Sequence, residues 1–119
     1  MTTQPIMIEN GQVVIHTNAN DIWLTQSQIA DLFGVFVAAV NANIRAIRKS
    51  GVLHEEHVCR RTRCRDGNIV ERYSLEMVAA LAFRLKSENT EVFRRWIVER
   101  ATTPAIVRKI PTSKDRVLN

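Results

Sequence analysis

The side chains with the clearest chemical potential in this chain are basic, and they are concentrated in one short segment. Residues 60–65 carry four guanidinium groups within six positions, in the order Arg-Arg-Thr-Arg-Cys-Arg. A dense group of permanent positive charges favours a polyanionic partner, because each phosphate that it neutralises releases condensed counterions. A solvated charged surface is the ordinary alternative for such a run. Arg60, Arg61, Arg63 and Arg65 are therefore candidate contacts to a nucleic-acid backbone.

The basic residues of the whole chain are likewise concentrated in its later part. Residues 1–44 hold three acidic residues and no Lys or Arg, whereas residues 45–119 hold all 17 basic residues and nine acidic ones. The two parts therefore carry net charges of −3 and +8, and the positive charge of the chain lies entirely in the later part. A positive field confined to one part of a small domain is typical of proteins that bind nucleic acid.

A second group of reactive side chains lies just before and among the arginines, and it consists of His54, Glu55, Glu56, His57, Cys59 and Cys64. The two cysteines would point to opposite faces of a single strand, and no further CxxC or HxxxH pair accompanies them. The glutamates are most simply explained as part of a solvated loop. No nucleophile with a base, paired carboxylates or phosphate-binding glycine loop occurs, so we expect no metal, no cofactor and no enzymatic activity.

The elements that position the basic residues begin with a predicted pair of helices. Thr25 is a typical N-cap, and the apolar residues that follow it have helical spacing up to Phe33. Gly34 then suits a sharp turn that requires a positive φ, and Val40 would complete a shared core. This order predicts a helix-turn-helix between residues 23 and 47.

The second of these helices is expected to turn Val37, Val40, Ile44 and Ile47 toward the core. Steps of 100° around its axis then place six residues outward: Ala38, Ala39, Ala42, Arg45, Ala46 and Lys49. Asn41 lies at the edge of that face. The residues predicted to contact DNA from this helix are Ala38, Asn41, Ala42, Arg45 and Lys49, with Asn41 suited to adenine, Arg45 to guanine, and the alanine methyls to thymine.

The remaining elements are predicted from turn and cap signals. Asn10-Gly11 indicates a hairpin with strands 6–8 and 12–16, and Asp66-Gly67 indicates a second one between 57–65 and 68–73, with arginines on both faces. A short helix around 48–56 or a loop through Gly51 separates them from the helix pair. Ser74 and Ser87 are expected to cap two final helices, the first spanning Leu75 to Lys86 and the second presenting Phe93, Trp96 and Ile97 on one face.

These elements predict a mainly helical α+β fold: a winged helix-turn-helix-like domain with two small β-hairpins and C-terminal helices. We assign residues 1–103 to this domain and 104–119 to a tail, or to the start of a longer natural protein. No apolar run reaches the ~20 residues that span a bilayer, and the N-terminus lacks the features of a signal peptide. We expect a cytoplasmic protein with no membrane partner.

The chain resembles the RhuM-like family of virulence-associated and mobile-element proteins. The resemblance covers roughly residues 22–101 and is carried by short motifs in a shared order: Ile22 to Val35, Gly51-Val52-Leu53, Asp66-Gly67, Tyr73 to Met77, and Phe93-Arg94-Arg95-Trp96. It implies a DNA-binding domain with a helix-turn-helix, carried by phages or genomic islands. The chain departs from the family at residues 36–39, Phe-Val-Ala-Ala, where members tend to open the second helix with polar residues.

Two functions from different classes remain open at this point. One is a regulator that binds double-stranded DNA through the second helix and the arginine hairpin. The other is a protein-interaction module without base-specific reading, in which an apolar surface of Phe36, Ala38, Ala39 and Ala42 contacts a second copy of the chain or another protein. RNA binding is less favoured, because the chain offers no aromatic platform for stacking single-stranded bases.

Overall fold

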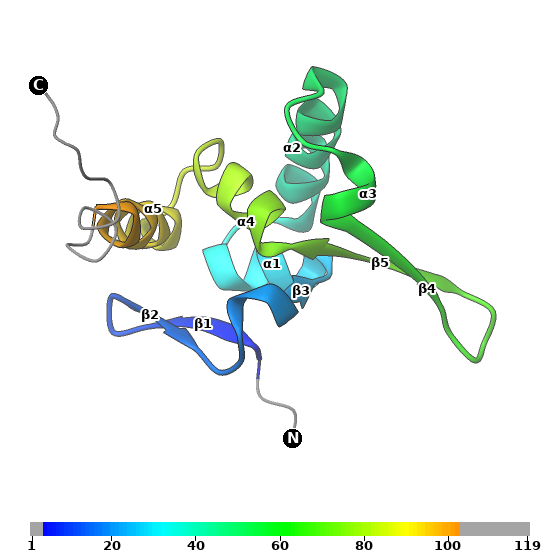
Figure 1. The fold of residues 1–119 in the computed structure, drawn as a ribbon, viewed down its shortest axis with the longest axis horizontal. Coiled ribbons are helices and arrows are strands. Elements are labelled where there is room, and N and C mark those ends of the chain that lie inside the picture. Colours follow the sequence, from blue (N-terminus) through cyan, green and yellow to red (C-terminus); the bar gives the residue numbers. More distant parts are fainter. Residues whose placement is uncertain (1–3, 103–119) are drawn as a thin grey trace, which may run out of the picture.

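Five α-helices and two small antiparallel sheets make up residues 4–102, the part of the chain that the computed structural model describes (Figure 1). About half of these residues are helical, which confirms the α+β class. The predicted tail, residues 104–119, lies outside the described residues. In chain order the elements are β1 (Ile6–Glu9), β2 (Gln12–Ile15), η1 (Ala19–Asp21, a 3-10 turn), β3 (Trp23–Leu24), α1 (Gln26–Phe33), α2 (Val37–Ser50), α3 (Glu55–Val58), β4 (Cys59–Arg63), β5 (Ile69–Ser74), α4 (Leu75–Ala82) and α5 (Glu88–Ala101).

The first hairpin forms where the sequence predicts it. β1 and β2 pair antiparallel from Ile6 opposite Ile15 to Glu9 opposite Gln12. The two turn residues, Asn10 and Gly11, both have positive φ, at 52° and 73°. These are the conformations of a type I′ turn, whose twist matches that of the flanking strands.

The two central helices also begin and turn as predicted. The Thr25 side chain accepts a hydrogen bond from the Gln28 amide, and the Gln28 side chain accepts one from the Thr25 amide, which completes a capping box. Gly34 ends α1 in the left-handed conformation with φ of 66°. Gly34 and the two residues after it lead into α2, whose axis is bent by 112° from that of α1.

The buried face of α2 differs from the predicted one in two places. Val40, Ile44 and Ile47 are buried as expected, but Val37 is 44% exposed because the first turn of α2 extends beyond the core. Ala39 was expected to point outward, and it is instead partly buried and packs against the core. α2 contacts both α1 and α4, so its buried face is wider than a single stripe.

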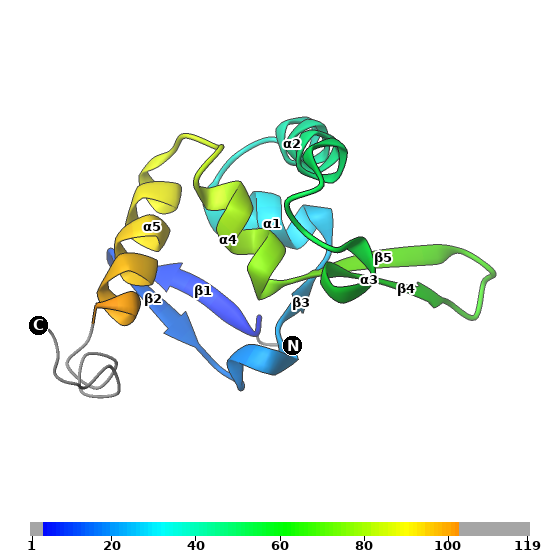
Figure 2. The same cartoon turned by 45° about the horizontal axis from the view of Figure 1, so that its top comes forward.

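The second hairpin is part of a larger sheet, which its turn signal does not indicate. β5 lies between β4 and β3, so the hairpin contributes to a three-stranded sheet whose inner end covers the core (Figure 2). His57, predicted in the strand, belongs to α3, because the chain first makes one helical turn packed through the buried Val58. Arg65 lies in the loop that joins β4 to β5, since the ladder ends at Arg63 opposite Ile69.

The C-terminal helices are partly as predicted. Ser87 caps α5 through a capping box with Thr90. α4, however, ends at Ala82 rather than Lys86, because the Arg94 guanidinium takes the carbonyls of Ala82 and Leu85 as acceptors and holds the chain in a turn there. Ser74 occupies the N-cap of α4, but its side chain makes no capping hydrogen bond.

The core lies between the helices and the two sheets, and the outer half of the β4–β5 hairpin extends away from it (Figures 1 and 2). α5 lies at the opposite end of the domain, beside β2 and α4. No single helix among residues 4–102 is long and apolar enough to cross a membrane; only α1 and α2 together reach that length and composition, across their bend.

Candidate nucleic-acid interface

The outward face of α2 carries most of the residues that the sequence selected. Ala38, Ala42, Arg45 and Lys49 are all exposed, and their spacing keeps them on one side of the helix. The helix is preceded by Phe36, whose side chain is 85% exposed. This face is therefore mostly methyl groups near its N-terminus and positively charged toward its C-terminus.

The register of β4 and β5 separates the hairpin arginines onto two faces. Arg61 stands opposite Glu71 and Arg63 opposite Ile69 on one face, whereas Arg60 stands opposite Arg72 on the other. The Arg60 guanidinium lies 4.0 Å from the centre of the Trp23 ring, across the middle strand. Such stacking holds the flat guanidinium in place and leaves its N–H groups free for an anion.

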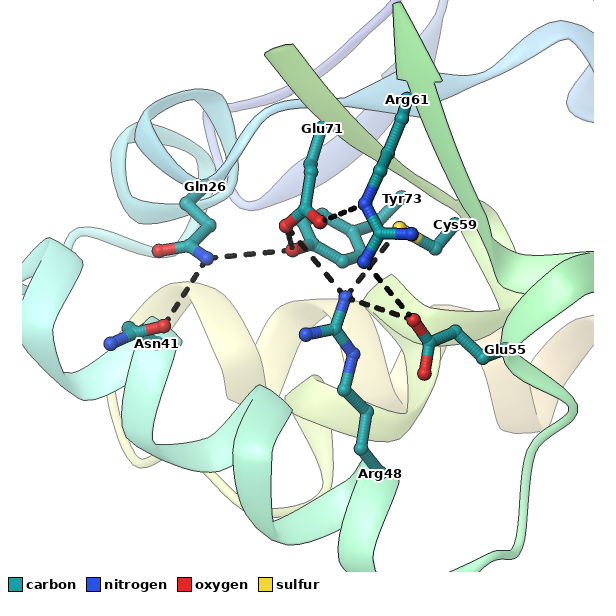
Figure 3. Close-up of polar contacts among 8 residues, drawn as sticks. All are labelled: Gln26, Asn41, Arg48, Glu55, Cys59, Arg61, Glu71 and Tyr73. Atoms are coloured by element: carbon teal, nitrogen blue, oxygen red, sulfur yellow. Dashed lines mark hydrogen bonds and ion pairs between the residues drawn. The ribbon is translucent and has the colours of Figure 1, made fainter. Parts of the chain in front are cut away.

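Arg61 is engaged within the protein, in a group of charged residues that we call the charge network: Arg48, Glu55, Arg61 and Glu71 (Figure 3). The closest pair joins Arg61 Nε and Glu71 Oε2 at 2.7 Å, and Glu55 lies 3.4 Å from the same guanidinium. Arg48 Nη2 lies 3.7 Å from both glutamates. The network ties α2 to α3 and to both strands of the hairpin, and thereby sets the position of the hairpin relative to α2.

A buried tyrosine adjoins the charge network. The Tyr73 side chain is fully buried and donates a hydrogen bond of 2.8 Å to Glu71. That bond, aided by the two arginines, lowers the pKa of Glu71 against the opposing effect of burial. Burial raises the pKa of Tyr73. At neutral pH the pair is thus a carboxylate and a neutral phenol.

Asn41 and Gln26 continue these polar contacts toward the surface of α2. Gln26 Nε2 donates to Tyr73 Oη at 3.5 Å and to Asn41 Oδ1 at 3.3 Å (Figure 3). Both side chains are partly buried. Asn41 therefore contacts another side chain of the protein through its oxygen, which the sequence did not indicate.

Five exposed cations on α2 and the hairpin have no such acidic partner. Within the described residues every ion pair on α2 and the hairpin involves Arg48 or Arg61, so no carboxylate lies within 4.0 Å of the other exposed basic groups there: Arg45, Lys49, Arg60, Arg63 and Arg65. Within the part of the chain that the structure describes, the Arg63 guanidinium donates one hydrogen bond, to the Gly67 carbonyl at 3.4 Å. Each of these residues is exposed. All nine predicted site residues thus lie on the surface of α2 or the hairpin or at its edge, and among the charged ones Arg61 alone is paired with carboxylates.

An open hollow of about 600 Å³ lies between the hairpin and the N-terminal ends of α1 and α2. Its lining includes Gln26 from α1, Val37 from α2, and Ile69 and Glu71 from β5. The hollow separates the two parts of the candidate interface and gives access to Gln26 from outside.

Sequence reasoning missed the residues that assemble this interface. Glu55 was assigned to a solvated loop, but it forms ion pairs with Arg48 and Arg61. Glu71 and Tyr73 alternate with Arg72 along β5, and that period of two was the available signal that they share one face. His54 and His57 lie with ring centres 5.6 Å apart, and the described residues contain no group of three or more potential ligands placed to hold a metal ion.

Comparison with known proteins adds nothing to these observations, since no family model, no curated protein and no solved structure matches the chain.

Proposed function

We propose that this protein binds double-stranded DNA as a winged helix-turn-helix domain. α2 would lie in the major groove, and the β4–β5 hairpin would act as a wing against the phosphate backbone. The three-residue turn with its left-handed Gly34 and the 112° bend between α1 and α2 support this proposal, because helix-turn-helix pairs cross at about 90–120° through turns of this length. The resemblance to RhuM-like proteins supports a regulatory role at a phage, island or virulence locus.

The observation that carries the proposal is the separation of paired from unpaired cations. The fold provides carboxylates for Arg48 and Arg61 but none within 4.0 Å for Arg45, Lys49, Arg60, Arg63 and Arg65. Unpaired cations on a protruding hairpin and an adjacent helix face repel one another, and a phosphate backbone removes that repulsion. The arrangement therefore favours a polyanion as the partner.

Individual roles follow from side-chain chemistry. The hairpin arginines without an acidic partner, Arg60, Arg63 and Arg65, suit phosphates, as does Lys49. Phosphate contacts position a protein on the duplex without reading its sequence. Arg45 suits the two acceptors of guanine, and the methyl groups of Ala38 and Ala42 suit thymine. A protein with this role works where the DNA is, which agrees with the cytoplasmic location expected from the sequence.

Binding of the full chain to a labelled random-sequence duplex, measured by fluorescence anisotropy across a salt series, tests the proposal. We expect log Kobs to fall linearly with log salt concentration, with a slope of about −0.9 for each phosphate neutralised and therefore about −4 to −5 if all five cations engage. No binding at low salt, or binding that salt leaves unchanged, would contradict DNA as the partner.

The exposed apolar start of α2 favours a second candidate function, a protein-contact surface. Phe36, the N-cap residue of α2, is 85% exposed, and Val37, its first residue, is 44% exposed. If this surface joins two copies, Phe36→Ser should convert a dimer into a monomer in sedimentation, with DNA affinity per chain reduced only through loss of the second copy. A parent chain that sediments as a monomer at every concentration contradicts the dimer.

A further inference from the structure

The direction of hydrogen bonds between Glu71 and the surface of α2 has a consequence for DNA reading. Glu71 is a carboxylate and can only accept, so the Tyr73 hydroxyl must donate its single proton to it. The Tyr73 oxygen is then left to accept a hydrogen bond. Gln26 must therefore turn its amide nitrogen inward, where it donates both to Tyr73 and to Asn41.

The outward atoms of the two amides are thereby determined. Because the Oδ1 atom of Asn41 accepts the hydrogen bond from Gln26, the Nδ2 amino group of Asn41 points away from Gln26 (Figure 3). Gln26 uses its nitrogen for both bonds, and its Oε1 likewise points away from Tyr73 (Figure 3). Neither outward atom has a hydrogen-bond partner within residues 4–102. The result is an unused donor beside an unused acceptor.

The position of this pair suits contact with a base rather than with a phosphate. Asn41 shares its helix face with Ala38, Ala42 and Arg45, and Gln26 lines the open hollow beside the first turn of α2. An outward carbonyl oxygen repels a phosphate, so Gln26 requires a donor from its partner. Of the four bases, only adenine presents an acceptor, N7, beside a donor, the N6 amino group, on its own major-groove edge.

We infer that Gln26 of α1 and Asn41 of α2 together form a specificity-determining pair for one adenine in the major groove, with Asn41 donating to N7 and Gln26 accepting from N6. The inference rests on the proposed DNA binding and adds a reading residue from α1. Glu71 and Tyr73 act as positioning residues, since they set which way both amides face.

The substitution Gln26→Glu tests the inference most sharply. A carboxylate cannot donate, so Asn41 should turn its amino group inward and present its oxygen, which leaves two acceptors facing the groove. Two acceptors suit the N4 amino group of cytosine. Binding-site selection from a random duplex pool should then change the preferred base from adenine to cytosine at one position, whereas the parent should discriminate there by about 5- to 150-fold.

Gln28→Glu is the matched control. It adds the same charge to the same end of α1, and a glutamate retains the capping box with Thr25. This variant should keep the adenine preference of the parent while showing any general loss of affinity caused by an added negative charge. Circular dichroism of each variant confirms that it is folded.

Gln26→Ala keeps the test decisive if the glutamate variant does not fold. It should reduce discrimination for adenine at that one position to less than about threefold. An unaltered adenine preference in either Gln26 variant would overturn this inference and leave DNA binding intact. A parent chain that binds no duplex would overturn the proposed function, and this inference with it.

Discussion

Replacing Arg63 and Arg65 together with alanine should weaken binding to random duplex about a hundredfold at 0.1 M salt and reduce the salt slope by about 1.8. Each of these residues is exposed and has no carboxylate within 4.0 Å, so each is available to neutralise one phosphate. Counterion release then contributes about tenfold in affinity per contact at this salt concentration. Anisotropy titrations of parent and variant across the salt series measure both quantities.

Two controls make this result specific to the hairpin. Lys86→Ala with Arg95→Ala removes the same charge from the segment before α5 and from α5 itself, at the end of the domain opposite the hairpin (Figure 1). This variant should keep the parent's salt slope. Arg61→Ala should also change the slope by much less than one phosphate, because Arg61 already pairs with Glu55 and Glu71. Equal losses in all three variants would mean that net charge, not the hairpin, determines binding.

The second large effect concerns stability, and it is expected from Phe93→Ala. The Phe93 side chain is 0% exposed and lies with its ring centre 5.4 Å from Phe33 and 5.3 Å from Trp96. Truncating a buried aromatic removes its transfer free energy and leaves a cavity, at a cost of about 3–5 kcal/mol. That is a large share of the ~5–15 kcal/mol by which a domain of this size is stable, so the melting temperature should fall by more than about 12 °C.

Phe83→Ala is the matched control for this stability effect, because Phe83 is 58% exposed after the last turn of α4. Its replacement should change the free energy of unfolding by less than about 1 kcal/mol. Urea and thermal unfolding followed by circular dichroism compare the two variants. A Phe93→Ala variant as stable as Phe83→Ala would contradict the packing of α5 against α1.

Local signals predicted the helix starts and turns well. Thr25 and Ser87 form capping boxes, and Gly34 and the Asn10-Gly11 pair adopt the positive φ values that their turns require. Capping and turn chemistry involve residues only a few positions apart, so their geometry is nearly independent of the rest of the chain. The same locality explains why the arginine-rich hairpin was recognised from its Asp66-Gly67 turn.

Predictions that depended on neighbours distant in the sequence were less successful. The prediction of Lys86 as the end of α4 was wrong because Arg94, on the next helix, takes the carbonyls near Ala82. The prediction of Ala39 as an outward residue was wrong because α2 packs against two helices at once. Helical periodicity describes a face but not its width, which depends on how many elements pack against it.

The sequence by itself determined the α+β class, the starts of the central helices, and the concentration of positive charge after residue 44. Only the tertiary structure decided which of those charges remain available, by bringing Glu55 and Glu71 to Arg48 and Arg61 while leaving Arg63 and Arg65 unpaired. It likewise placed Gln26 between Tyr73 and Asn41. The physical reason is range. A cap or a turn is complete within a few residues, whereas an ion pair or a hydrogen-bond chain depends on strand register and on the packing of distant elements, such as those that bring Gln26 to Tyr73 across 47 positions.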